Sequence, residues 1–107
     1  MIIAIPASER KIEAIVDERF GRCPFFCFYH TDSEKIEFKE NLYKDAIEAV
    51  GLQVAEFLAE FKINEVLATE IGPKAQNILN KLNIKSTIIE RGKTIQEIVN
   101  TFVNNKF

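Results

Sequence analysis

The stretch that is most informative about the fold is Asp17-Glu18-Arg19-Phe20-Gly21-Arg22-Cys23-Pro24-Phe25-Phe26-Cys27. It places a glycine, two arginines, a thiol and a proline directly before a run of aromatic residues. The residues after Pro24 are strong β-formers and predict a strand, whereas the polar residues before it predict a loop. A loop that carries cationic side chains and a thiol, and that is held at one end by a strand, is a typical place for a ligand.

The composition indicates a single domain over residues 1–107, and its 47% apolar content is enough for a core without disulfides. The net charge of −2, with Lys and Glu spread evenly, argues against a nucleic-acid surface, which would show a basic stripe. No segment approaches the roughly 20 apolar residues of a membrane span, and no signal peptide is recognisable. We therefore expect a cytoplasmic protein with no membrane contact, whose two cysteines are reduced.

The first part of the chain predicts strands. Ile2–Ile5 is a continuous apolar run typical of a strand buried on both faces, and Pro6 is expected to end it because proline cannot donate to a ladder. Residues 12–16 give only a weak strand signal. Phe25–His30 and the alternating segment Lys35–Glu40 predict a hairpin whose second strand lies at the edge of a sheet.

Helices and strands alternate in the second part. Apolar residues at spacings of three and four predict a helix with the face Ile47, Val50, Val54, Phe57, Leu58 and Phe61. Gly51 interrupts this pattern, so either the helix tolerates it or the helix begins near Gly51 and residues 41–50 form a loop.

The remaining elements have clearer boundaries. Glu65–Thr69 and Ile84–Ile89 predict strands. Between them a helix opens at Gly72-Pro73, and the capping box Thr94-Ile95-Gln96-Glu97 starts a final helix. The order β-β-β-α-β-α-β-α predicts an α/β fold, a mixed sheet with helices on both faces.

This topology brings four loops to one edge of the sheet, namely residues 7–24, 41–51, 70–73 and 90–94. Ligands of open α/β sheets bind at that edge, where helix N-termini offer unpaired N–H groups. We expect the residues that line one concave edge there to be Arg19, Arg22, Cys23, Ile71 and Gly72. His30 should lie at the opposite edge.

The residue types at this edge indicate an anion site. In isolation Arg19 and Arg22 are as easily read as solvated charges, but beside two helix starts they favour a bound anion. Glu70 would repel that anion unless it points away or meets a cation.

The two thiols are predicted to differ. Cys23 could supply one soft ligand to a metal, whereas Cys27 lies in mid-strand and is expected to be a core residue. Four residues of strand span about 13 Å, which is too far for a disulfide between them. No catalytic motif is present, so we expect a protein that is not an enzyme.

Glu18–Phe26, together with Ile71-Gly72-Pro73-Lys74-Ala75, resembles the dinitrogenase iron–molybdenum cofactor biosynthesis family over essentially the whole chain. The resemblance implies an RNase H-like three-layer α/β/α fold with a five-stranded mixed sheet in which one strand is antiparallel. The family commonly has a histidine directly before Phe-Gly, where this chain has Arg19. Arginine is not a metal ligand and can only pair with anionic groups.

The resemblance also implies the cargo, an iron–sulfur-type cluster or its precursor, and a cluster-donor or acceptor protein as partner. On this interpretation Cys23 is the metal ligand, and the cluster contacts Arg19, Phe20, Gly21, Arg22, Cys23, Gly51, Ile71 and Gly72. A module that binds a small organic anion at the same edge without metal is the alternative. An RNase H-like hydrolase ranks last, because the strands carry apolar residues where two metals would need carboxylates.

Overall fold

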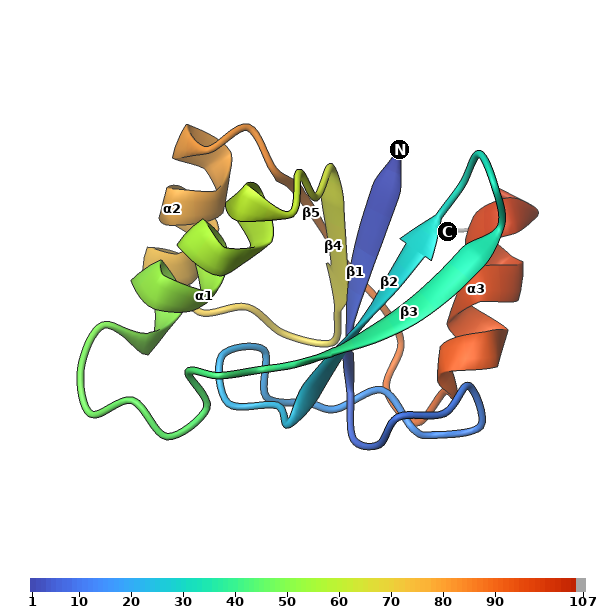
Figure 1. The fold of residues 1–107 in the computed structure, drawn as a ribbon, viewed down its shortest axis with the longest axis horizontal. Helices are drawn as coiled ribbons and strands as arrows, with labels where there is room; N and C mark the ends of the chain where they lie inside the picture. The colour runs from blue at the N-terminus through green and yellow to red at the C-terminus, as the bar shows by residue number, and fades with distance from the viewer. Residues whose placement is uncertain (106–107) are drawn as a thin grey trace.

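The computed structural model describes residues 1–105 and shows the predicted order of elements (Figure 1). The elements are, in chain order, β1 (Ile2–Ala7), β2 (Phe25–His30), β3 (Lys35–Glu40), α1 (Val50–Glu60), β4 (Glu65–Ala68), α2 (Pro73–Lys81), β5 (Lys85–Ile88) and α3 (Ile95–Val103). Among these residues no helix has the length and apolar character needed to cross a membrane.

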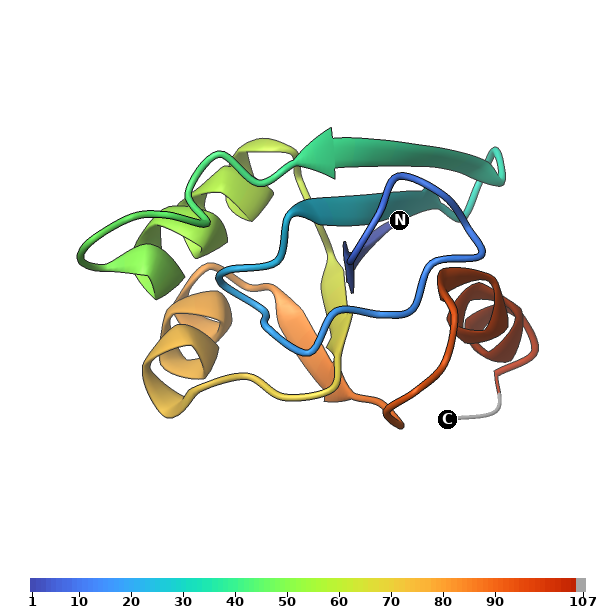
Figure 2. The same ribbon diagram turned by 90° about the horizontal axis from the view of Figure 1, so that it is seen from below.

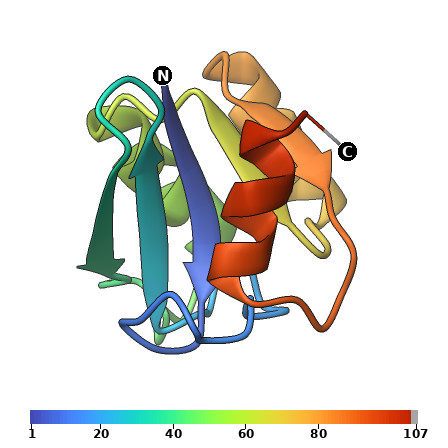
Figure 3. The same ribbon diagram turned by 90° about the vertical axis from the view of Figure 1, so that its right-hand side faces the viewer.

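The five strands form one mixed sheet in the order β3-β2-β1-β4-β5 (Figure 3). β2 runs antiparallel to both β1 and β3, whereas β4 and β5 continue the sheet parallel to β1. The predicted five-stranded mixed sheet with one antiparallel strand is therefore confirmed. The register sets Ala7 opposite Phe25 and Ile2 opposite His30.

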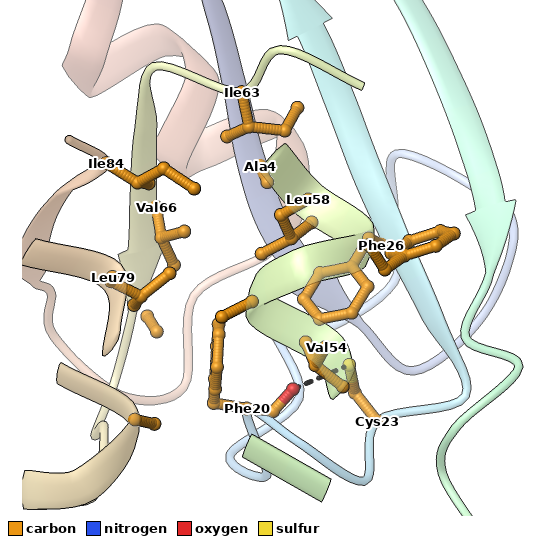
Figure 4. Packing of buried hydrophobic residues seen from close by; sticks show 14 of the residues in the cluster. Ala4, Phe20, Cys23, Phe26, Val54, Leu58, Ile63, Val66, Leu79 and Ile84 are labelled. Atoms are coloured by element: carbon orange, nitrogen blue, oxygen red, sulfur yellow. Dashed lines mark hydrogen bonds between the residues drawn. The ribbon is translucent and has the colours of Figure 1, made fainter. Parts of the chain in front are cut away.

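Helices cover both faces of the sheet, with α1 and α2 on one face and α3 on the other (Figures 1 and 2). Successive strand residues point to opposite faces. Thus Ala4 and Val66 pack in the cluster that contains α1 and α2, and Ile3 and Leu67 pack in the cluster that contains α3. Figure 4 shows the first cluster closing around Leu58 of α1.

Some predicted boundaries were wrong. The first strand does not end at Pro6, which lies opposite Phe26 and accepts a hydrogen bond from the Asp17 N–H at 3.0 Å. Proline lacks only the donor, so its carbonyl can still extend the pairing. The weak strand signal at residues 12–16 corresponds to two isolated bridges, Ala7 with Val16 and Ile15 with Thr94.

The helix α1 begins at Val50, so residues 41–49 form a loop, as one of the two interpretations held. Ile47 was expected on the buried helix face but is 95% exposed in this loop. The helix starts where it does because Ala49 adopts a left-handed conformation, with φ of 55°, directly before it. The last strand is also two residues shorter than Ile84–Ile89.

The loops meet at one edge of the sheet, as predicted from the topology. Figure 2 views the molecule from this edge, and residues 8–24 cross it between the helices of the two faces. The chain segments after β1, β3, β4 and β5 all begin there. His30 lies at the opposite end of β2, where its Nε2 is 2.8 Å from Oε2 of Glu37.

Leu58→Ala should lower the free energy of unfolding by about 2–5 kcal/mol, because it leaves a cavity under α1. Leu58 is fully buried, whereas Leu42 is 70% exposed, so Leu42→Ala is the matched control and should cost less than about 0.5 kcal/mol. Urea unfolding of both variants measures the difference. Equal effects would contradict the described packing of α1.

Candidate functional site

A cleft of about 770 Å³ lies at the edge where the loops converge. Its walls come from the loop at residues 18–21, from the first residues of α1 and from the segment that leads into α2. The lining residues are Glu18, Arg19, Phe20, Gly21, Val50, Gly51, Glu70, Ile71, Gly72, Pro73, Lys74 and Ala75. Six of the eight residues predicted for the site therefore line one cleft, namely Arg19, Phe20, Gly21, Gly51, Ile71 and Gly72.

Both α1 and α2 begin at this cleft with their N-terminal N–H groups uncapped by side chains. The N-cap of α2 is Gly72 and that of α1 is Ala49, and neither makes a side-chain capping hydrogen bond. The first N–H groups of a helix have no partner within the helix, and the helix dipole adds positive potential at the same place. Two such ends at one cleft favour an anion.

The three glycines at the cleft differ in what surrounds them, and Gly51 is the one that allows a close approach of two helices. A Cβ added to Gly51 would lie 3.3 Å from Cβ of Ala75, so this glycine lets α1 pack closely on α2. A Cβ on Gly21 would lie 3.5 Å from the Val50 side chain, which is ordinary contact. A Cβ on Gly72 would meet open space, so the backbone at the start of α2 is accessible.

Arg19 is fixed at the cleft by Asp17. Its Nε and Nη2 donate to the two carboxylate oxygens at 3.0 and 2.9 Å, and its backbone N–H donates to Oδ1 at 2.8 Å. Burial raises the pKa of Asp17, but the hydrogen bonds and charge of Arg19 outweigh this, and the net pKa is lowered. Asp17 is thus ionised and offsets much of the Arg19 charge.

Lys74 is a further cation in the cleft wall, and it was missed as a site residue. It is exposed in the first turn of α2, and within residues 1–105 no carboxylate pairs with it. Its position directly after Gly72-Pro73 at a predicted helix start was the signal that could have identified it. It leaves the cleft with one cation free for a ligand, as far as the described residues go.

The predicted position of Arg22 in the cleft is wrong. Its Nη1 donates to the carbonyls of Lys44 and Ala46, at 2.9 and 3.1 Å, and it does not line the cleft. The two carbonyls belong to the loop at residues 41–49, so Arg22 links that loop to its own loop at residues 8–24.

The predicted position of Cys23 in the cleft is also wrong. The residue is fully buried under α1, and its thiol donates to the carbonyl of Phe20 at 3.3 Å (Figure 4). Burial raises the pKa of Cys23 to about 12, and the charge of Asp17 acts in the same direction. A thiol that stays protonated inside the core is a poor metal ligand. No group of three or more His, Cys, Asp or Glu within residues 1–105 could hold a metal ion.

The predictions for Cys27 and for the pairing of the thiols are confirmed. Cys27 is fully buried among the residues that face α3, and both cysteines are free. Burial raises the pKa of Cys27 to about 12.

Asn41 is a structural residue of the site that the sequence did not reveal. It is 1% exposed, and its Nδ2 donates to the carbonyls of Gly21 and Cys23 at 2.8 and 2.9 Å. Its Oδ1 accepts from the Tyr43 N–H at 3.1 Å. This one amide joins the loop at residues 8–24 to the loop at residues 41–49.

Glu70 pairs with a cation, which was one of the two ways in which a carboxylate could lie beside the predicted anion site. Arg91, from the segment after β5, places Nη2 3.0 Å from Oε2 of Glu70 and Nη1 2.8 Å from Oε1 of Glu18. Both carboxylates line the cleft, and one guanidinium neutralises part of their charge.

The fold and the cleft define an α/β protein with a cleft at the edge where two helices begin, and no metal-ligand set occurs within residues 1–105. The sequence profile of the family "Dinitrogenase iron-molybdenum cofactor" matches residues 1–105, and the chain belongs to this family. An uncharacterized protein of Methanocaldococcus jannaschii is 27% identical over 109 residues, which cover 99% of this chain and 88% of the relative.

Two solved structures of similar proteins share the fold. The apo form of the orange protein from Desulfovibrio gigas is 26% identical with a TM-score of 0.92, covering 98% of this chain and 88% of that one. A Thermotoga protein of the DUF35 family is 28% identical with a TM-score of 0.84, covering 98% of this chain and 89% of that one.

Both thiols of the native protein should react slowly with a thiol reagent at pH 8 and rapidly once the protein is unfolded. Their pKa values of about 12 exceed the ordinary 9.0, so the protonated thiols stabilise the fold. This contribution is complete below pH 9.0 and is lost as the pH rises toward about 12. Rapid native labelling of Cys23 would show that the thiol reaches the surface, contrary to its described position.

Proposed function

We propose that this protein binds and carries a preassembled anionic metal–sulfur cluster, of the iron–sulfur type, without chemical turnover. The observation that carries the proposal is the cleft itself, where two uncapped helix N-termini and Lys74 face a volume of about 770 Å³. Membership of the iron–molybdenum cofactor family supports a cluster as the cargo.

The chemistry of the walls suggests recognition without metal–protein bonds. The lining residues include neither cysteine nor histidine, and Cys23 lies behind the wall in the core. The cargo would therefore keep its own ligands, and the protein would supply N–H donors, the ammonium group of Lys74 and the guanidinium group of Arg19. An arginine in the position of the family's histidine fits this mode, because it pairs with anions and not with metals.

The apolar part of the cleft favours a sulfide-rich anion over a strongly hydrated one. Val50, Ile71 and Pro73 present hydrocarbon surface between the cationic groups. Sulfur is large and polarizable and packs favourably against such surface, whereas small hard anions lose hydration there without enough donors in return.

We further propose that the protein is not an enzyme. The ionisable oxygen groups among the lining residues are Glu18 and Glu70, and both pair with Arg91. Neither has a hydroxyl or thiol nucleophile next to it in the wall.

A carrier needs a donor or acceptor protein for its cargo, and we propose that such a protein is the partner. We also propose that the fold is RNase H-like, which is supported by the three layers that α1 and α2, the sheet, and α3 form (Figures 1 and 2).

A module for small organic anions without metal is the second candidate. It is favoured by the same absence of cysteine and histidine from the wall, because nothing in the wall requires the anion to contain a metal. The two candidates differ in visible absorbance after exposure to a preassembled iron–sulfur cluster.

Anaerobic incubation with a preassembled iron–sulfur cluster that carries its own thiolate ligands, followed by desalting, should leave the wild type with visible absorbance. Lys74→Glu reverses the charge of the unpaired cation in the wall. At low salt it should lower the affinity for the cluster by roughly tenfold, and the retained absorbance should fall several-fold as a result. Lys81→Glu, at the other end of the same helix, is the control and should retain the wild-type level.

Cys23→Ala should also retain the absorbance, since its thiol is not in the wall, while losing about 1–2 kcal/mol of stability through the cavity. Loss of absorbance in this variant, with its fold intact by circular dichroism, would restore Cys23 as a ligand. A wild type that never gains absorbance but binds organic anions would favour the second candidate.

A further inference from the structure

Arg91 joins three loops at the mouth of the cleft. Its guanidinium comes from the segment between β5 and α3, Glu18 belongs to the loop after β1, and Glu70 belongs to the loop after β4. Nη1 lies 2.8 Å from Oε1 of Glu18, and Nη2 lies 3.0 Å from Oε2 of Glu70. Arg91 is not among the lining residues, so it acts on the cleft through these carboxylates.

The formal charges around the cleft show what Arg91 changes. Arg19 is balanced by Asp17, with which it makes a two-pronged ion pair. The two remaining carboxylates, Glu18 and Glu70, are balanced by Lys74 and Arg91 together. Without Arg91 the cleft would hold two carboxylates against the single ammonium group of Lys74, so the formal charge of these side chains would be negative.

The fold does not depend on this bridge. Side chains of Arg91, Glu18 and Glu70 are 57, 54 and 64% exposed, and exposed ion pairs add little to stability. Other contacts hold the same segment in place, among them hydrogen bonds from the Val16 N–H to the Lys93 carbonyl and from the Ile95 N–H to the Ala14 carbonyl. The capping box of Thr94 and Glu97 fixes the start of α3. Loss of the guanidinium should therefore change charge far more than structure.

We propose that Arg91 is the positioning residue that sets the charge preference of the cleft. By holding Glu18 and Glu70 and neutralising part of their charge, it makes the wall more favourable to an anion. Without it the same wall favours anions less and cations more. The inference rests on the proposed function in that it takes this cleft as the anion site.

The test uses a preassembled four-iron, four-sulfide cluster with four 2-mercaptoethanol ligands, which is a dianion. Its affinity is measured by equilibrium dialysis for the wild type, for Arg91→Gln, and for the triple variant Glu18→Gln/Glu70→Gln/Arg91→Gln. Arg91→Gln should lose about tenfold in affinity at low ionic strength, and the loss should shrink as salt is added. The triple variant removes one positive and two negative charges. It should therefore bind the cluster at least as tightly as the wild type, and by up to about tenfold more tightly.

Two controls separate charge at the cleft from other effects. Lys81→Gln removes the same charge at the far end of α2 and should change the affinity by less than about twofold. The melting temperature of Arg91→Gln should stay within about 5 °C of the wild type. Arg91→Lys should bind the cluster more tightly than Arg91→Gln but less tightly than the wild type. It keeps the positive charge but lacks the two N–H groups with which Arg91 contacts Glu18 and Glu70.

A second measurement does not depend on the cluster. Manganese(II), followed by water proton relaxation, should bind more tightly to Arg91→Gln than to the wild type, and the triple variant should lose this gain. If the wild type binds the cluster and Arg91→Gln binds it equally well, or if the triple variant fails to recover, the role of Arg91 is overturned while the carrier function stands. If the wild type binds no cluster, the proposed function fails, and manganese binding alone decides the role of Arg91: no gain in Arg91→Gln overturns it.

Discussion

The structure of the binding edge depends on one buried side-chain amide, that of Asn41. Its Nδ2 donates to the carbonyls of Gly21 and Cys23, and its Oδ1 accepts from the Tyr43 N–H. The backbone N–H of Asn41 also donates to the carbonyl of Pro24 at 3.0 Å. A buried polar group that loses its hydrogen-bond partner costs about 1–3 kcal/mol. The loop that forms one wall of the cleft therefore has its shape because this amide fixes its end.

The fixed loop decides which of its side chains reach a ligand. Phe20 turns inward, and its ring packs edge-on against Phe26 with centroids 5.9 Å apart. Cys23 follows it into the core and donates to the Phe20 carbonyl. What remains at the surface is Arg19, the backbone of Gly21, and Glu18, which is held by Arg91. A loop that buries its thiol and exposes charge is suited to a ligand that brings its own metal coordination.

The sequence predicted the fold well because its periodic patterns are local. The β-branched run at Ile2–Ile5, the glycine-proline pair before α2 and the capping box at Thr94 each carry their structural meaning within a few residues. The convergence of the loops followed from topology alone. The directions of Arg22 and Cys23 could not be predicted in the same way, because they depend on contacts with Lys44, Ala46 and Asn41 about twenty residues away. The start of α1 was equally hidden, since alanine at position 49 gives no local signal for a left-handed conformation.

The central claim is that the cleft holds an anionic cluster through backbone N–H groups and charge, with no bond from the protein to metal. Titration of ¹⁵N-labelled protein with the dianionic four-iron cluster, followed by amide NMR spectra, tests this most directly. The account predicts the largest changes at the N–H groups of Gly51, Lys74 and Ala75, with little change in β3 or in the middle of β2. Changes centred instead on Cys23 and Cys27, or spread evenly over the sheet, would contradict it.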